Sequence, residues 1–181
     1  MPKSNGKTFV IDASVARASG GMDAAFPLSK HSRDFLMRLL QSQHAAGFTP
    51  SIRAEWNAHQ SAFARTWIVQ MYARRRVVSS NADPSAVTVE KTIGKSGFSK
   101  KRTDAMLKDA HLIAAALIYD KTVVSLDDTV RRLFASCADK WTFTKDIAWL
   151  HPSESHDKIA QWLNAGAPLN AEYLLVNFEN D

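Results

Sequence analysis

The amino-acid sequence predicts an α/β fold of three layers, α/β/α, with a mainly parallel central sheet. Short apolar runs of strand type alternate with longer helical stretches along the 181 residues. Two strand-type runs follow a helix-rich middle, which favours crossover connections and parallel strands. Since 45% of the residues are hydrophobic, the chain can build one full core. We assign residues 1–150 to the main domain and residues 151–181 to a C-terminal extension, packed on that domain or appended to it.

The first half of the chain begins with the run KTFVI. The expected elements are a strand at 7–11, an amphipathic helix at 29–43, a short extended piece at 47–51, a helix at 52–76, and at 76–80 either a strand or the end of that helix. Pro50 suits the first turn of a helix, and Ser51 is the candidate N-cap.

The second half begins with a polar, basic stretch that we expect to be a surface excursion. The expected elements are that excursion at 81–102, a helix at 104–119, a strand at 121–126, a helix at 129–135, a strand at 140–144 and a helix at 153–163. Thr103 and Asp104 fit the start of the first of these helices. The tail at 172–181 is ambiguous.

The composition excludes several classes of protein. No apolar run approaches the ~20 residues of a membrane-spanning helix, and the first residues lack the apolar segment of a secretory signal. We therefore expect a cytoplasmic protein with no membrane partner. The single cysteine, Cys137, excludes an internal disulfide framework and a cysteine-based zinc cluster, and we expect it in or near the core. The net charge of +5 favours polyanionic partners.

The stretch GKTFVIDASVARASGG places a carboxylate, Asp12, directly after the first strand. In an open parallel sheet, ligands bind at the carboxyl ends of the strands, so Asp12 is a candidate site residue. The alternative is a helix cap or a turn aspartate.

A second acid, Glu55, lies early in the helix that follows the short extended piece. A capping box begun by Ser51 would need its acid at Ala54, so the box does not explain Glu55. A carboxylate that interacts with the helix dipole is the alternative. His59 follows four residues later and is expected to be an unliganded histidine near an acid.

The third and fourth acids lie in the second half. Periodicity places Asp109 on the apolar face of the 104–119 helix with Ala105 and Leu112, where an ionised carboxylate needs a cation. Asp127 follows an apolar strand, as Asp12 does, and Asp128 then stands where the next helix needs its N-cap.

Carboxylates at strand ends and helix starts are the ligands that Mg²⁺ and Mn²⁺ prefer. Because crowded carboxylates repel one another, a metal-free form should have raised carboxylate pKa values. The blocks FVIDAS, Glu55 early in a helix, DAHLIAAAL and VVSLDD resemble the four acidic blocks of the PIN domain. That fold belongs to many metal-dependent ribonucleases, including VapC-type toxins. The resemblance covers roughly residues 8–144.

The resemblance implies a PIN-like nuclease domain that hydrolyses RNA phosphodiester bonds with one or two Mg²⁺ or Mn²⁺ ions. The implied catalytic residues are Asp12, Glu55, Asp109 and Asp127, of which Asp12, Asp109 and Asp127 are metal ligands. Ser14, Ser125 and Asp128 are expected to support them. The partners implied are RNA, a second copy of the chain, and an antitoxin if the protein is a toxin.

Basic residues near these acids are candidates for binding nucleic acid. The segment GKSGFSKKR combines Lys100, Lys101 and Arg102 with Phe98 as a stacking ring, and Arg131 follows the fourth block. The alternative is that these residues are solvated faces of helices.

Three other functions compete for the same residues. A PIN-like module could bind RNA or protein without cutting. A haloacid-dehalogenase-like phosphatase would use Asp12 as nucleophile with a second aspartate at the position of Ser14. A phosphate-binding loop ending in TIGKSG would need glycine at the position of Val89.

Overall fold

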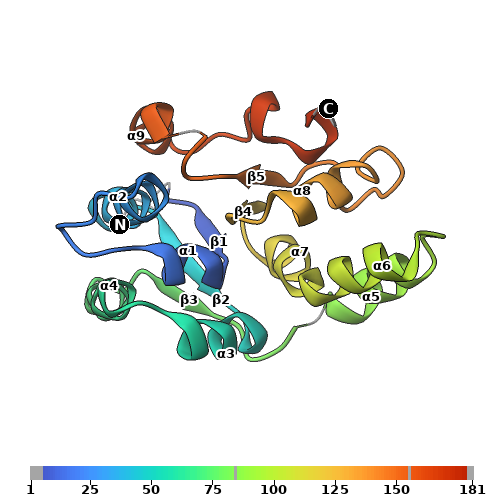
Figure 1. The fold of residues 1–181 in the computed structure, drawn as a ribbon, viewed down its shortest axis with the longest axis horizontal. Helices are drawn as coiled ribbons and strands as arrows, with labels where there is room; N and C mark the ends of the chain where they lie inside the picture. Colours follow the sequence, from blue (N-terminus) through green and yellow to red (C-terminus); the bar gives the residue numbers. More distant parts are fainter. Residues whose placement is uncertain (1–5, 84, 155, 179–181) are drawn as a thin grey trace, which may run out of the picture.

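The computed structural model describes residues 6–83, 85–154 and 156–178. It contains one five-stranded sheet in the order β3-β2-β1-β4-β5, and each neighbouring pair of strands is parallel (Figure 1). The strands are β1 (Thr8–Ile11), β2 (Ala45–Phe48), β3 (Val77–Ser79), β4 (Thr122–Val124) and β5 (Ala148–Leu150). The predicted α/β class with a parallel sheet is confirmed.

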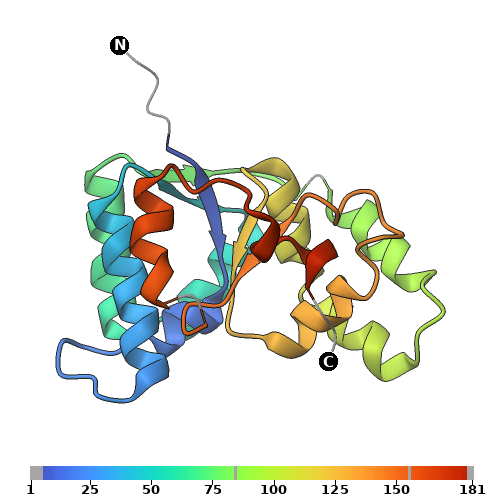
Figure 2. The same cartoon turned by 90° about the horizontal axis from the view of Figure 1, so that it is seen from above.

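Helices cover both faces of this sheet. They are α1 (Ala13–Ala18), α2 (Pro27–Gln41), α3 (Pro50–His59), α4 (Ala62–Ala73), α5 (Ala86–Gly94), α6 (Lys100–Lys108), α7 (Ala110–Ile118), α8 (Asp128–Ala135) and α9 (His156–Asn164), followed by the 3-10 turns η1 (Ala171–Tyr173) and η2 (Leu175–Asn177). Figure 2 shows α2, α4 and α9 on one side of the sheet and α5 to α8 on the other. The arrangement is the expected three-layer α/β/α fold.

The central strands are apolar because both of their faces are covered by helices. Phe9, Val10 and Ile11 of β1 are buried, and the backbone N–H of Asp12 donates to the Val124 carbonyl at 2.9 Å. This bond continues the pairing of β1 with β4 by one residue. The end of β1 is therefore fixed against the end of β4.

Two expected elements in the first half are wrong. The 52–76 segment is two helices, because the chain turns extended at Gln60 and the Ser61 hydroxyl then caps α4 by accepting from the Ala64 N–H at 3.0 Å. Thr49, not Ser51, is the N-cap of α3. Pro50 opens that helix as expected, and residues 77–79 form a strand.

The second half departs further from expectation. The 81–102 segment is not only a surface excursion, since it contains α5, whose Val89 and Ile93 are fully buried. The 104–119 helix is two helices, and the first begins at Lys100 rather than at Thr103 and Asp104. Residues 140–144 form turns, whereas the last strand is the fully buried β5. Residues 140–144 alternate polar and apolar side chains and so resemble a strand with one buried face. Strand β5 is buried on both faces and shows no such alternation, so the pattern does not identify it.

The residues after β5 pack on the same core. Helix α9 lies against α2, and the Trp162 ring is 5.5 Å from that of Phe9. The Leu175 N–H donates to the Ile147 carbonyl at 3.0 Å. The C-terminal residues therefore cover an edge of the sheet that would otherwise expose apolar side chains.

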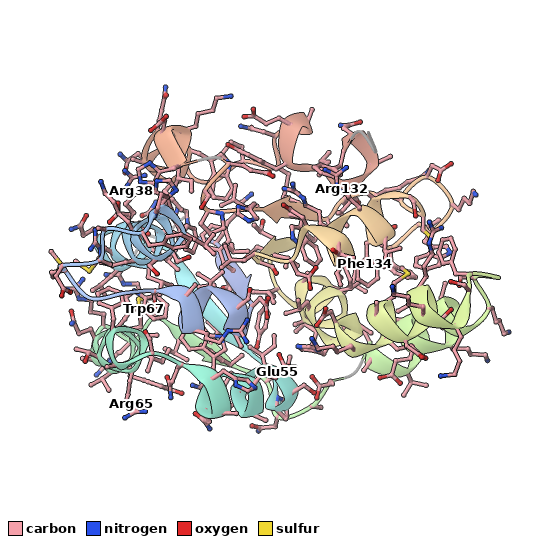
Figure 3. All side chains as sticks on the ribbon, in the orientation of Figure 1. Arg38, Glu55, Arg65, Trp67, Arg132 and Phe134 are labelled. Carbon is pink, nitrogen blue, oxygen red and sulfur yellow. The ribbon has the colours of Figure 1, made fainter. Side chains whose placement is uncertain are left out.

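The cysteine and most of the tryptophans lie in the core. Cys137 is buried, as are Trp56, Trp67, Trp149 and Trp162, while Trp141 is partly buried. The Trp67 indole donates to the Leu36 carbonyl of α2 at 2.6 Å, which ties α4 to α2 (Figure 3). In the part of the chain that the structure describes, no helix has both the length and the hydropathy to cross a membrane.

Candidate functional site

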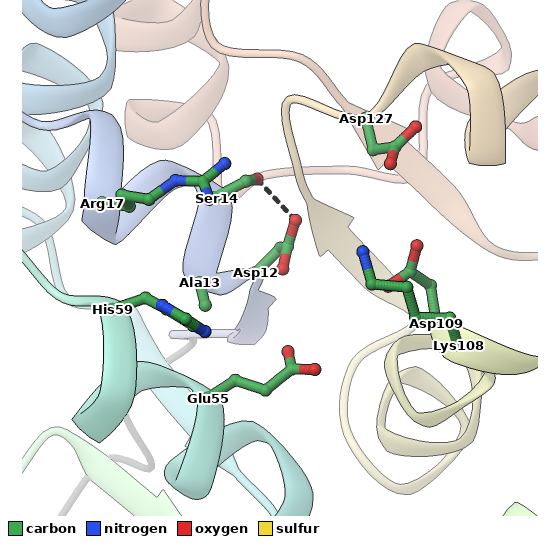
Figure 4. A pocket seen from close by; sticks show the side chains of 9 residues that line it. All are labelled: Asp12, Ala13, Ser14, Arg17, Glu55, His59, Lys108, Asp109 and Asp127. Atoms are coloured by element: carbon green, nitrogen blue, oxygen red, sulfur yellow. Dashed lines mark hydrogen bonds between the residues drawn. The ribbon is translucent and has the colours of Figure 1, made fainter. Parts of the chain in front are cut away.

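Acidic side chains from distant parts of the sequence line one pocket of about 150 Å³ (Figure 4). Its lining residues are Asp12, Ala13, Ser14, Arg17, Glu55, His59, Lys108, Asp109 and Asp127. The pocket lies at the carboxyl ends of β1 and β4, where the strand order reverses direction. Such a switch point is the usual ligand site of an open parallel sheet.

Asp12 is held by two hydroxyl groups. Its Oδ2 atom accepts hydrogen bonds from the Oγ atoms of Ser14 at 2.5 Å and Ser125 at 2.7 Å. The Ser14 and Ser125 hydroxyls also accept from the backbone N–H groups of Leu126 and Asp127, each at 3.1 Å. The two serines thus fix both Asp12 and the loop after β4. Asp12 stands at the N-cap position of α1 but makes no side-chain cap bond, so its carboxylate is not used to cap that helix.

Asp127, not Asp128, is the N-cap of α8. Its Oδ1 atom accepts from the Val130 N–H at 2.9 Å, and the carboxylate also lines the pocket. Asp128 instead pairs with Arg131 at 2.9 Å, outside the pocket lining. The expectation that Asp128 caps the helix is therefore wrong. Asp127 therefore both caps α8 and lines the pocket with Asp12.

Asp109 lies at the break between α6 and α7 rather than on a continuous helical face. It is only 8% exposed, and its carboxylate lines the pocket. Burial, followed by the charges of Asp12 and Asp127, raises the pKa of Asp109 to about 6, while Lys108 and His111 act in the opposite direction. The repulsion expected among crowded carboxylates is therefore present at Asp109.

Glu55 points from α3 into the pocket towards Asp12 and Asp109 (Figure 4). It is held by a residue that was not among the predicted site residues. Its Oε2 atom lies 3.0 Å from Nε2 of His111, whose Nδ1 lies 3.1 Å from the Lys108 carbonyl. Both ring nitrogens of His111 thus face oxygen acceptors. A signal existed: His111 is the one polar residue in α7, two positions after Asp109. His59 lines the same pocket as Glu55, near an acid as expected.

Two cationic side chains stand at the rim. Arg17 of α1 and Lys108 of α6 are both exposed and line the pocket from opposite sides (Figure 4). Arg17 is not among the predicted site residues, although it lies three residues after Ser14 on the helix that begins after Asp12. A phosphate group in the pocket would lie between these two cations.

The predicted nucleic-acid contacts divide into two groups. Lys100, Lys101 and Arg102 are exposed in the first turn of α6, and Lys100 pairs with Asp104 at 2.8 Å. Arg131, in contrast, is only 4% exposed. The expectation that Arg131 contacts nucleic acid is wrong.

Arg131 has internal partners instead. Its guanidinium forms two 2.7 Å hydrogen bonds with the Glu154 carboxylate and lies 4.0 Å from the Phe178 ring centroid. These hydrogen bonds hold the pKa of Glu154 below its usual value. Arg131 therefore joins α8 to the C-terminal residues.

Arg131→Ala should destabilise the fold without changing RNA affinity. We expect a loss of about 2 kcal/mol, or about 4–8 °C in Tm, because two hydrogen bonds between charged groups and the packing of the buried guanidinium on Phe178 are lost. Thermal unfolding measures this loss, with Arg65→Ala, an exposed arginine of α4, as the control expected to change stability by less than about 0.5 kcal/mol (Figure 3). A Tm equal to that of the wild type would contradict the structural role.

The donors of the pocket fit a hard divalent cation. They are carboxylate oxygens, and burial together with the charges of Asp12 and Asp127 raises the pKa of Asp109, so a bound cation would favour its ionised form. Across residues 6–83, 85–154 and 156–178, no group of three or more His, Cys, Asp or Glu side chains is arranged to hold a metal ion. Mg²⁺ commonly binds through one or two carboxylates and keeps several waters or substrate oxygens.

In comparisons with known proteins, no family model matches the sequence, and no curated protein or solved structure matches it significantly. Function is therefore inferred from the geometry of the pocket and from the acidic blocks themselves.

Proposed function

We propose that the protein is a Mg²⁺- or Mn²⁺-dependent endoribonuclease of the PIN type. The observation that carries this proposal is the meeting of Asp12, Glu55, Asp109 and Asp127, each from a different segment, in one pocket at the carboxyl edge of the sheet. These are the positions that the resemblance of the acidic blocks implies. Four carboxyl groups outnumber the two cationic side chains, Arg17 and Lys108, that line the same pocket, and gathering negative charge in this way is unfavourable unless a cation binds among them.

Asp12, Asp109 and Asp127 would hold the cation. When bound, it lowers the pKa of an attacking water and stabilises negative charge on the phosphoryl oxygens as a Lewis acid. Ser14 and Ser125 keep the carboxylate of Asp12 in one orientation. The hydroxyl bonds use Oδ2, and in the part of the chain that is described Oδ1 accepts no hydrogen bond.

Glu55 acts from the opposite wall. Its Oε2 atom is taken by His111, which leaves Oε1 to orient the attacking water and accept its proton. Arg17 and Lys108 bind the phosphate oxygens from the two sides of the rim. The basic surface of α6 beside the pocket favours a polyanionic substrate over a small phosphate ester.

The phosphatase alternative fits the geometry less well. A haloacid-dehalogenase-like enzyme needs a second carboxylic acid two residues after its nucleophile. Here that residue is Ser14, whose hydroxyl donates to Asp12 and accepts from the Leu126 N–H. This side chain serves to position Asp12 rather than to protonate a leaving group.

Cleavage of labelled RNA tests the proposal. Purified protein should cut a mixture of single-stranded and structured RNAs in Mn²⁺ or Mg²⁺, and EDTA should abolish the cutting. A folded protein that binds metal and cuts none of these RNAs would favour the non-catalytic binding module instead. Growth arrest of a bacterial host by the wild type, but not by Asp12→Asn, would place the activity in a toxin.

His111→Gln should lower kcat about tenfold with a smaller change in KM, since His111 positions the proton acceptor rather than the substrate. Single-turnover rates of His111→Gln, Glu55→Gln and the double variant form the measurement. Because His111 acts through Glu55, the double variant should lose no more than Glu55→Gln alone. Independent, multiplying losses would contradict the positioning role.

A further inference from the structure

A second pocket lies between α6 and α8. It has a volume of about 570 Å³ and is lined by Ser99, Lys101, Arg102, Ala105, Thr129, Arg132, Leu133 and Ser136. The two least exposed of these residues, Ala105 and Leu133, are apolar, whereas the cations are exposed. No acidic side chain is among these lining residues, in contrast to the acidic pocket.

The two pockets share the same pair of helices. The C-terminal end of α6 supplies Lys108 to the acidic pocket, and its earlier turns supply Lys101 and Ala105 to the second. Asp127 at the start of α8 lines the acidic pocket, and later residues of α8 line the second. Figure 1 shows α6 and α8 close to each other, and the two helices are in contact. At 1.5 Å per residue, the pockets lie about 5–10 Å apart along α6.

An apolar floor with cations at its rim matches a nucleobase followed by a phosphate. Ala105 and Leu133 can pack against the face of a base, while Lys101 and Arg102 contact the adjoining phosphate. Bases in a duplex are stacked inside the helix and cannot enter such a pocket, whereas an unpaired base can. A pocket lined in this way is therefore suited to an unpaired base.

We propose that the α6–α8 pocket binds one unpaired base of single-stranded RNA beside the scissile phosphate. This inference rests on the proposed ribonuclease function and adds a substrate class to it. In this proposal Lys101 and Arg102 contact RNA as the sequence predicts. The further contacts come from Ala105 and Leu133, and not from the buried Arg131.

Equilibrium binding in EDTA tests the pocket without any need for cleavage. The probe is a fluorescent single-stranded 12-nucleotide RNA, compared with the same strand in a duplex. The wild type should prefer the single strand at least tenfold. The double variant Lys101→Ala/Arg102→Ala should weaken single-strand binding at least tenfold and lower the salt slope by about 1–2. Lys91→Ala/Lys95→Ala, which removes equal charge from exposed positions on or next to α5, is the matched control.

Ala105→Phe separates base binding from charge. It fills the pocket without altering net charge, and it should remove the preference for the single strand. Removing one base at a time from the probe should identify a position whose loss weakens binding to the wild type but not to Ala105→Phe. Thermal unfolding checks that each variant is folded. If Ala105→Phe is not folded, the result for Lys101→Ala/Arg102→Ala decides the test.

The outcomes distinguish the pocket from the ribonuclease proposal. If the wild type cleaves RNA but Lys101→Ala/Arg102→Ala binds single strands as tightly as the wild type does, the base-binding pocket is ruled out and the proposed ribonuclease function is unaffected. If the wild type binds without cleaving and Lys101→Ala/Arg102→Ala loses binding, the pocket is supported and catalysis is not. Equal affinity of the wild type for single strand and duplex also overturns the inference.

Discussion

Asp12→Asn is expected to lower the rate of RNA cleavage by at least about 100-fold, since disturbing even the hydrogen-bond partners of metal ligands costs 10–100-fold. The substitution preserves the size of the side chain and its contact with the two serines. It removes the charge that stands at the end of β1, between the other acids. Initial rates at saturating Mn²⁺ measure the loss.

The matched control for this variant is Asp104→Asn. Asp104 is exposed on α6, where it pairs with Lys100, and it does not line the acidic pocket. We expect its cleavage rate to stay within about twofold of the wild type. Equal losses in the two variants, or full activity of Asp12→Asn, would contradict the assigned role of Asp12.

Asp109→Asn should inactivate the enzyme and yet stabilise the metal-free protein. The pKa of Asp109 is about 6 in the fold, against 3.8 as its ordinary value. A raised pKa means that its contribution to stability is present below about pH 4 and is lost as the pH rises through 6. At pH 8 the buried ionised carboxylate therefore destabilises the fold, by about 1–3 kcal/mol, and asparagine relieves this.

Thermal unfolding in EDTA shows whether Asp109→Asn raises or lowers the stability of the metal-free protein. Asp109→Asn should melt about 2–12 °C above the wild type at pH 8, and the difference should shrink towards pH 4. Mn²⁺ should raise the Tm of the wild type and have much less effect on the variant. A variant less stable than the wild type in EDTA at pH 8 would show that Asp109 is a structural residue.

The sheet and three of its acids could be predicted because their signals are local. Asp12 directly follows a short apolar strand, Asp127 comes shortly after another, and Glu55 lies in the helix that Pro50 begins. Parallel pairing then brings the ends of β1 and β4 together without any further information. Hydrophobic pattern is sufficient for this part of the site.

The break at Asp109 could not be predicted from periodicity. Met106, Ala110 and Ile113 are all buried, so the apolar spacing continues across the break as it would along one helix. The same limit applies to Arg131 and Arg132, which are adjacent in one amphipathic helix. Arg131 is buried because Glu154 and Phe178 lie beside it, and these partners come from a segment whose position only the tertiary fold fixes.

The anomalous scattering of Mn²⁺ in soaked crystals tests the central claim most directly. We predict a peak in the acidic pocket, about 2.1 Å from carboxylate oxygens of at least two of Asp12, Asp109 and Asp127. The peak should disappear in Asp12→Asn crystals. A well-ordered pocket with no peak at millimolar Mn²⁺, or a peak bound only elsewhere, would contradict the metal-dependent nuclease.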